Sequence, residues 1–294
     1  MKSGGDLFIA GSSATTIEIP ANSLLTNGFA FYGCHNLRSI KLHDNIEVIG
    51  EYTFAYCKNL SSISMPKNLL WIKGWAFFRC DNLSSVTFNN NLLQIDYGAF
   101  VGCNGLREIV LHEGVEVLGG HVFAECQNLV SVTLPNSITS FGDLIFGGCK
   151  KLSKVALPNQ MKSMPNGIFA GCSSLSNIHI PETVTIIDIE AFEGTAISSI
   201  NIPIGVTEIG MYAFYNCKNM TKVTIPENVV KMGYGCFCGT TSVESFVVKP
   251  INVPEGGEIM FGNTNCPIYV PASSVEAYKS APYWKDYSSR IKAY

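Results

Sequence analysis

The chain has 294 residues, of which 47% are hydrophobic and 15% charged, and its formal net charge is −3 at pH 7. This apolar content excludes a disordered chain, and the small charge gives no electrostatic reason to expect a nucleic acid or an anionic membrane as partner. No apolar run approaches the roughly 20 residues that a membrane-spanning helix needs, so we expect no membrane span.

The first residues, MKSGGDLFIAGSS, lack the basic region and the long apolar stretch of a secretory signal peptide. We therefore expect any export signal or anchor to lie outside this sequence.

A phenylalanine column then marks a repeat along almost the whole chain. Its members are Phe8, Phe31, Phe54, Phe77, Phe100, Phe123, Phe146, Phe169, Phe192, Phe214, Phe237 and Phe261. Most neighbours in this column are 23 residues apart, and a fixed period of this length predicts stacked structural units.

Cysteine follows the phenylalanine by three residues in most units, in a column formed by Cys34, Cys57, Cys80, Cys103, Cys126, Cys149 and Cys172. The chain has 11 cysteines, but the spacing is neither that of paired zinc ligands nor the CxxC of a redox dithiol. We interpret the column as small, buried, reduced thiols that fill the same inward position in each unit.

Each unit predicts two short strands and one turn. In the unit that starts at Phe54, Leu60, Ile63 and Met65 show the alternation of a strand, and Pro66 ends it. The later V-x-x-I-G segment suits a second extended segment on the opposite side, and A-F-x-G-C suits a tight turn. One unit cannot bury these apolar columns alone, so we expect units stacked about 4.8 Å apart.

Departures from the repeat lie at both ends and at two internal units. The unit at 8–30 is degenerate. The unit at Phe192 is one residue short and has Thr195 in the cysteine position, and in the unit at Phe237 Thr240 replaces cysteine. We expect a solenoid over 1–248, followed by a final degenerate repeat and cap over 249–294.

The cap is predicted to contain one short helix. Ser273 and Glu276 fit a capping box, and Pro282 would end the helix. We expect an apolar group to cover the open end of the stack, as terminal units of a solenoid must. Its members are Tyr278, Tyr283, Trp284, Tyr287 and Ile291.

The unit A-F-x-G-C-x-x-L-x-x-I-x-L-P-x-x-V-x-x-I-G resembles the BspA-like leucine-rich repeats of bacterial surface proteins. The segment I-Y-V-P-x-x-S-V-x-A-Y-K-x-A-x-x-W at 268–284 resembles the closing segment common in such proteins from anaerobic gut and oral bacteria. The resemblance implies an α/β leucine-rich-repeat solenoid, mostly β, of about eleven stacked coils with a short C-terminal helical cap. It also implies a secreted or surface-anchored protein used in adhesion.

No residue pattern predicts catalysis or a metal site. The chain has five histidines but no H-E-x-x-H or spaced Cys/His set, and it has no carboxylate pair typical of glycosidases, no G-x-S-x-G motif and no phosphate-binding glycine loop. Asn59, Asn82 and Asn219 match the glycosylation sequon, but a turn role for their side chains explains them better. We predict a protein that is not an enzyme and has no cofactor.

The outward positions of the first strand form the candidate binding face: Arg38, Lys41, Ser62, Ser64, Ser84, Ser85, Thr87, Arg107, Glu108, Lys154, Asn177, His179 and Asn201. The alternative is a merely solvated β face. Off that strand, Trp71, Trp75 and Tyr97 suggest either a binding hot spot or packing between coils, and we favour packing.

The sequence thus favours a non-catalytic module that binds a protein of host matrix, host cell or another bacterial surface, or an extended polymer. A structural spacer presenting another domain is the alternative, and a glycan-binding or glycan-processing protein is a weaker one.

Overall fold

The computed structural model describes residues 8–9, 12–13, 15–21, 25 and 27–294. The chain is a mostly β solenoid of about 12 coils of about 23 residues, close to the number expected from the sequence. Its contacts divide it into two compact units, Met1–Pro158 (unit 1) and Asn159–Tyr294 (unit 2). A separate cap beginning at residue 249 stays a prediction.

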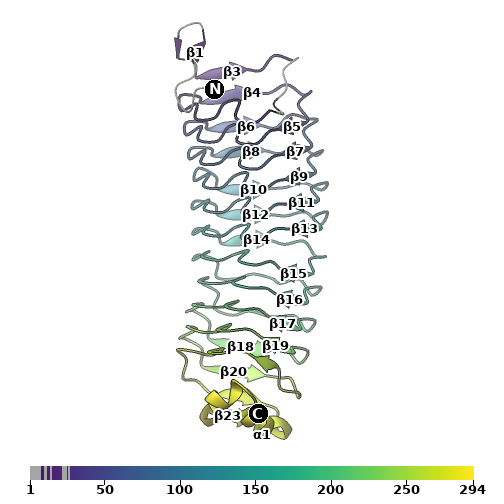
Figure 1. Ribbon diagram of the computed structural model, residues 1–294, viewed down its shortest axis with the longest axis vertical. Coiled ribbons are helices and arrows are strands. Elements are labelled where there is room, and N and C mark those ends of the chain that lie inside the picture. The colour runs from purple at the N-terminus through teal and green to yellow at the C-terminus, as the bar shows by residue number, and fades with distance from the viewer. Residues whose placement is uncertain (1–7, 10–11, 14, 22–24, 26) are drawn as a thin grey trace. The chain divides into compact units, whose positions relative to one another are not determined.

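Each coil of unit 1 contributes a strand of three residues to a first face, as predicted. These strands are parallel to their neighbours and lie in two sheets, β3-β4-β6-β8 and β10-β12-β14 (Figure 1). Their bounds are β3 Thr16–Glu18, β4 Ser39–Lys41, β6 Ser62–Ser64, β8 Ser85–Thr87, β10 Glu108–Val110, β12 Ser131–Thr133 and β14 Lys154–Ala156.

A second face of unit 1 is a parallel sheet of shorter strands, in the order β13-β11-β9-β7-β5. It confirms the second extended segment predicted for each unit. Its strands are β5 Val48–Ile49, β7 Trp71–Ile72, β9 Gln94–Ile95, β11 Val117–Leu118 and β13 Ser140–Phe141. Partners in this sheet are 23 residues apart, as in Ile72 with Ile95.

Unit 2 repeats this arrangement and ends in short helical segments. Its second face has the order β15-β16-β17-β19-β21 and its first face β18-β20-β22-β23. The bounds are β15 Ser163–Met164, β16 Ile186–Ile187, β17 Glu208–Ile209, β18 Lys222–Ile225, β19 Lys231–Met232, β20 Ser245–Val248, β21 Glu255–Gly256, β22 Ile268–Val270, η1 Ala272–Ser274, α1 Val275–Ser280, η2 Trp284–Arg290 and β23 Ile291–Ala293.

The first phenylalanine departs from the repeat. Phe8 belongs to β1 (Phe8–Ile9), which pairs antiparallel with β2 (Ser12–Ser13) instead of forming a coil turn. The prediction that Phe8 starts a coil is therefore wrong for its backbone, because this segment satisfies its hydrogen bonds in a local hairpin. Its side chain lies outside the described residues.

The phenylalanine column forms the core of each unit. Phe54, Phe77 and Phe100 are fully buried, and their rings stack with centroids 5.2 and 4.9 Å apart. In unit 2, Phe192 stacks on Phe214 at 5.3 Å. Each coil alone would expose its ring faces to water, so stacking supplies much of the apolar burial that holds neighbouring coils together.

All cysteines are free thiols, ten of them buried and Cys266 half-buried, which confirms the expected reduced and buried column. The structure adds a polar role. Cys80 Sγ donates to the Phe54 carbonyl at 3.1 Å, and Cys103 Sγ to the Phe77 carbonyl at 3.1 Å, in each case 26 residues earlier. Where threonine replaces cysteine, as at Thr195, the hydroxyl donates to the phenylalanine carbonyl of its own coil at 2.9 Å.

The turn at each phenylalanine is left-handed at two positions, two residues before and two residues after the ring. In the turn around Phe100 these positions are Gly98 and Gly102, with φ of 64° and 71°. Other coils place non-glycine residues there, including Trp75 and Arg79. The glycine of the F-x-G-C motif is thus explained by backbone conformation.

The C-terminal helix and its apolar cover largely follow the prediction. Tyr278, Trp284 and Ile291 are buried, and Tyr287 is half-buried with its ring 5.3 Å from Phe261. Tyr283 is the exception, because it is 41% exposed and does not cover the stack. Its φ is positive, at 64°.

The capping box is also wrong. The residue before α1 is Ser274, which makes no cap bond, since its hydroxyl donates instead to the Ile251 carbonyl at 2.7 Å.

Candidate functional site

All thirteen residues of the predicted binding face are exposed, which agrees with outward positions on the coils. In β6, Ser62 and Ser64 are exposed on either side of Ile63, which is only 3% exposed. The strand period therefore directs small polar side chains outward and β-branched ones inward.

Five of the predicted residues come together in one hollow of about 400 Å³ between β8 and β10. Ser84, Ser85 and Thr87 lie on the β8 side, and Arg107 and Glu108 on the β10 side. Val86, Phe88, Val110 and His112 complete the lining. The hollow thus combines short hydroxyl side chains, one guanidinium, one carboxylate, one imidazole and an apolar wall, a mixture able to bind polar and apolar groups of a ligand.

The charged groups of the hollow differ in their partners. Glu108 Oε1 accepts a hydrogen bond from Ser131 Oγ at 3.2 Å. Arg107 has no ion-pair partner among the described residues of unit 1. Its guanidinium is therefore available to an acidic group of a ligand.

The other predicted residues of unit 1 lie on the same face but outside this hollow. Lys41 Nζ donates to Glu18 Oε1 at 2.7 Å, and this hydrogen bond raises the pKa of Lys41. Because both side chains are exposed, the pair contributes little to stability. Arg38, Ser62, Ser64 and Lys154 do not line this hollow.

In unit 2 the prediction fails in its secondary structure. Asn177, His179 and Asn201 are exposed, but segments 176–181 and 198–203 form no strand. The coil at Phe192 is one residue short, and the backbone bond from Ser198 N to Ser176 O is long at 3.4 Å. The shortened spacing alone does not account for the lost strands, because the second face keeps its pairing across the same coil, with Ile187 opposite Ile209. Asn201 lines a separate hollow of about 520 Å³ with Glu182, Thr224 and Lys249.

The aromatic residues flagged in the sequence separate into two places. Trp75 and Tyr97 are in contact, with ring centroids 5.2 Å apart. Trp71 lies on β7, where Lys73 Nζ is 6.0 Å from its ring, and it has no ring contact with either within the described part of unit 1.

Trp75 also stacks on Tyr52 and contacts Phe78 edge to face. Packing between coils therefore accounts for its half-buried position, as favoured from the sequence.

The sequon asparagines form bonds between coils. Asn59 Nδ2 donates to the His35 carbonyl at 2.6 Å, Asn82 Nδ2 to Asn59 Oδ1 at 3.3 Å and Asn219 Nδ2 to the Ala196 carbonyl at 3.4 Å. These asparagines lie in turns, as expected, but their side chains bond the preceding coil and not the nearby backbone.

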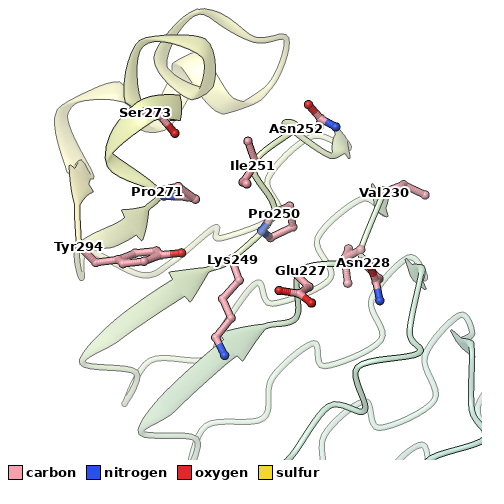
Figure 2. A pocket seen from close by; sticks show the side chains of 11 residues that line it. Glu227, Asn228, Val230, Lys249, Pro250, Ile251, Asn252, Pro271, Ser273 and Tyr294 are labelled. Carbon is pink, nitrogen blue, oxygen red and sulfur yellow. The ribbon is translucent and has the colours of Figure 1, made fainter.

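One pocket escaped the sequence prediction. Figure 2 shows it in unit 2, where the loop at 249–252 faces Pro271, Ser273 and Tyr294, and its volume is about 590 Å³. Val230, Ile251 and Tyr294 are apolar or aromatic yet 63%, 69% and 60% exposed. The only signal in the sequence is the loss of the repeat pattern after Val248, which does not indicate a concave surface.

The described residues contain no group of three or more His, Cys, Asp or Glu that could hold a metal ion. They also contain no helix long and apolar enough to cross a membrane.

Comparison with known structures shows the same fold. The chain is similar to a leucine-rich repeat protein from Eubacterium ventriosum, with 19% identity and a TM-score of 0.57 over 89% of this chain and 74% of that one. It is also similar to one from Bacteroides ovatus, with 20% identity and a TM-score of 0.52 over 85% and 88%. The leucine-rich repeat protein of T. pallidum is 30% identical over 57% and 74%, with a TM-score of 0.48.

No curated protein matches the chain. The family model for the BspA type leucine-rich repeat region matches residues 4–129, 94–219 and 207–281, in six copies. These matches span most of the sequence and include the coils on either side of the β8–β10 hollow. The chain therefore belongs to the BspA type leucine-rich repeat family.

Proposed function

We propose that the chain is a non-catalytic binding module that uses the first strand face of unit 1, centred on the hollow between β8 and β10. The observation that carries the proposal is the gathering of Ser84, Ser85, Thr87, Arg107 and Glu108 in one hollow. Solenoids of this family are generally binding scaffolds without catalytic activity.

The ligand is a protein or an extended polymer. Each coil exposes only two or three small side chains on this face, whereas a specific protein interface buries on the order of 800 Å² per partner. A partner must therefore span several neighbouring coils. Family membership supports an extracellular or cell-surface location and an adhesive role toward host matrix, host cells or other bacteria.

The test is binding of the purified protein to immobilised fibronectin, laminin and collagen by surface plasmon resonance. We expect at least one to bind, and Arg107→Glu with Ser84→Asp to weaken that binding at least about tenfold, because the loss of a hot-spot contact at an interface core costs about 2 kcal/mol or more. The melting temperature should not change, since both side chains are exposed.

Lys162→Glu is the matched control, an exposed charge reversal in unit 2 that should leave binding unchanged. Binding that survives the strand substitutions but is lost in Trp75→Ala would move the site to the aromatic cluster. Absence of binding to all three matrix proteins would contradict adhesion to host matrix.

A further inference from the structure

The ladder of the first face in unit 1 is interrupted between β8 and β10. Backbone bonds close the neighbouring coils, from Met65 N to Thr87 O and from Leu111 N to Thr133 O, both at 3.1 Å. In the described part of this unit, no equivalent bond joins Leu42 N to Ser64 O or Phe88 N to Val110 O. β4 and β6 nevertheless pair, whereas β8 and β10 belong to different sheets.

The interruption is confined to this face. On the second face the same two coils remain paired through β9 and β11, with Ile95 opposite Leu118. At the turn, Phe77 N donates to Ala99 O at 2.8 Å. The coils are thus held together on two sides, so that the opening between β8 and β10 is a fixed feature of a folded unit.

Phe88 lies at the opening. It occupies the column filled by Leu42, Met65 and Leu111 in neighbouring coils, and it is buried with its ring 5.8 Å from Phe100, edge to face. A benzyl group is larger than the aliphatic side chains of that column, and a close-packed core transmits the extra volume to its surroundings. We therefore attribute the separation of β8 from β10 to the phenylalanine ring between them.

The opening leaves backbone groups without ladder partners. A strand in a parallel sheet directs alternate N–H and C=O groups to its two neighbours. β8 pairs with β6, and β10 pairs with β12. The groups that β8 and β10 direct toward each other therefore line the hollow as two facing strand edges, and such edges accept an added strand.

We infer that this hollow binds an extended peptide segment of a partner protein, which pairs its backbone with the free edge of β8 or β10. The inference rests on the proposed function and specifies its mode of recognition. Backbone pairing supplies hydrogen bonds that the small hydroxyl side chains of this face cannot supply alone.

The lining specifies the side chains of the segment. Val86 is half-buried where the equivalent Ile63 and Val132 are 3% and 2% exposed, so the opening uncovers an apolar floor. Val110, 41% exposed, extends this floor along β10. Arg107, which has no ion-pair partner among the described residues of unit 1, favours a carboxylate. The geometry therefore selects an extended segment with alternating β-branched residues and an acidic residue at one end.

The first experiment measures amide hydrogen exchange in the free protein by NMR. The amides of Val86, Glu108 and Val110 should exchange much faster than those of Ile63 and Val132 in the paired strands. Phe88→Leu should slow them by closing the ladder, whereas Leu111→Met, in the same column of the next coil, should not. Equal protection of all five amides in the wild-type protein would overturn the inference.

The second experiment titrates the protein with the acetylated and amidated hexapeptide Asp-Thr-Val-Thr-Val-Thr. We expect binding that protects the Val86 and Val110 amides and is weakened by Phe88→Leu. Two control peptides carry N-methyl groups on both valines or on the second and third threonines. Alternate residues of an extended peptide direct their N–H groups to opposite sides, so only one of the two controls loses the N–H groups directed at the strand edge. That control should bind about tenfold more weakly than the parent peptide, and the other should bind equally well.

Equal binding of all three peptides, or no binding of the parent peptide, would overturn backbone pairing. These outcomes are distinguishable from failure of the proposed function. A matrix protein whose binding depends on Arg107 but leaves the Val86 and Val110 amides unprotected would support the binding face and contradict strand addition.

Discussion

At the scale of residues, two columns of the repeat hold the coils together by different means. The phenylalanine rings stack face to face, and the cysteine thiols donate to phenylalanine carbonyls of the preceding coil. The same carbonyl also accepts a backbone bond, as Phe77 O does from Cys80 N at 3.1 Å. The thiol therefore adds a second, weak bond to an acceptor that is already satisfied, and its apolar volume remains its main contribution.

The phenylalanine column gives the first stability prediction. Phe123 is fully buried, and its ring lies 5.5 Å from Phe100 and 5.8 Å from Phe146. Phe123→Ala should lower the free energy of unfolding by about 3–5 kcal/mol, because it removes contacts on both ring faces and opens a cavity. Urea denaturation followed by circular dichroism measures the loss. Phe29→Ala, at a ring that is 46% exposed, should cost clearly less. An equal loss for both would show that burial does not set the contribution of these rings.

At the scale of elements, the left-handed turns pair a large residue of one coil with a glycine of the next. A Cβ on Gly98 would lie 2.7 Å from Trp75 Cε3, and a Cβ on Gly235 would lie 2.7 Å from Tyr212 Cε1. Trp75 contacts Phe78 and Tyr97, and in unit 2 Tyr212 contacts Tyr215 and Tyr234 in the same way. The glycine thus leaves room for the aromatic ring of the adjacent coil.

This pairing makes Gly98→Ala more harmful than its backbone conformation alone requires. Gly98 and Gly194 share a φ of +64°, but the nearest atom to a Cβ on Gly194 is 3.9 Å away. Both substitutions should lose about 1–2 kcal/mol for the left-handed conformation. Gly98→Ala should lower the free energy of unfolding by roughly a further 1 kcal/mol or more, because of the clash with Trp75.

A double-mutant cycle with Trp75→Ala isolates the clash, because the additional loss should disappear when the ring is absent. If Gly98→Ala costs the same in both backgrounds, the ring does not determine the requirement for glycine.

At the scale of the whole molecule, the cysteine column couples stability to pH. Burial raises the pKa of Cys57 and of Cys126 to about 12 and that of Cys217 to about 11. Burial also raises the pKa of Cys80 and Cys103 well above the usual range. An unfolded thiol has a pKa of about 8.5, so above that pH the unfolded chain releases protons that the folded chain retains.

Stability should therefore be unaffected by these thiols below about pH 8.5 and should fall as the pH rises toward their folded pKa values. Each buried thiol contributes a loss of about 1.4 kcal/mol per pH unit in that window. Urea denaturation at pH 8 and pH 9, with a reductant present, should show a loss of several kcal/mol, roughly 0.7 kcal/mol from each of the five thiols. Cys126→Ser should reduce the slope by one thiol's share. Equal stability at both pH values would mean that the thiols ionise without unfolding.

The architecture of a single coil could be predicted from the sequence. The 23-residue period fixes which residues share a column, and the alternation within each unit fixes which side chains point inward. Ile63 and Ile109 are therefore buried, and Ser85 and Arg107 exposed, as predicted. These features follow from local backbone geometry repeated along the chain, and that is why a single sequence reveals them.

The place where the ladder is interrupted and the positions of the hollows could not be predicted, because they depend on packing between coils. The sequence shows Phe88 as one more apolar residue in its column, but its effect depends on the space between two coils. The loss of strands at His179 and Asn201, and the pocket beside Ile251, likewise depend on how neighbouring coils fit. Packing volume and ladder register are properties of pairs of coils, and a repeat pattern read one unit at a time does not contain them.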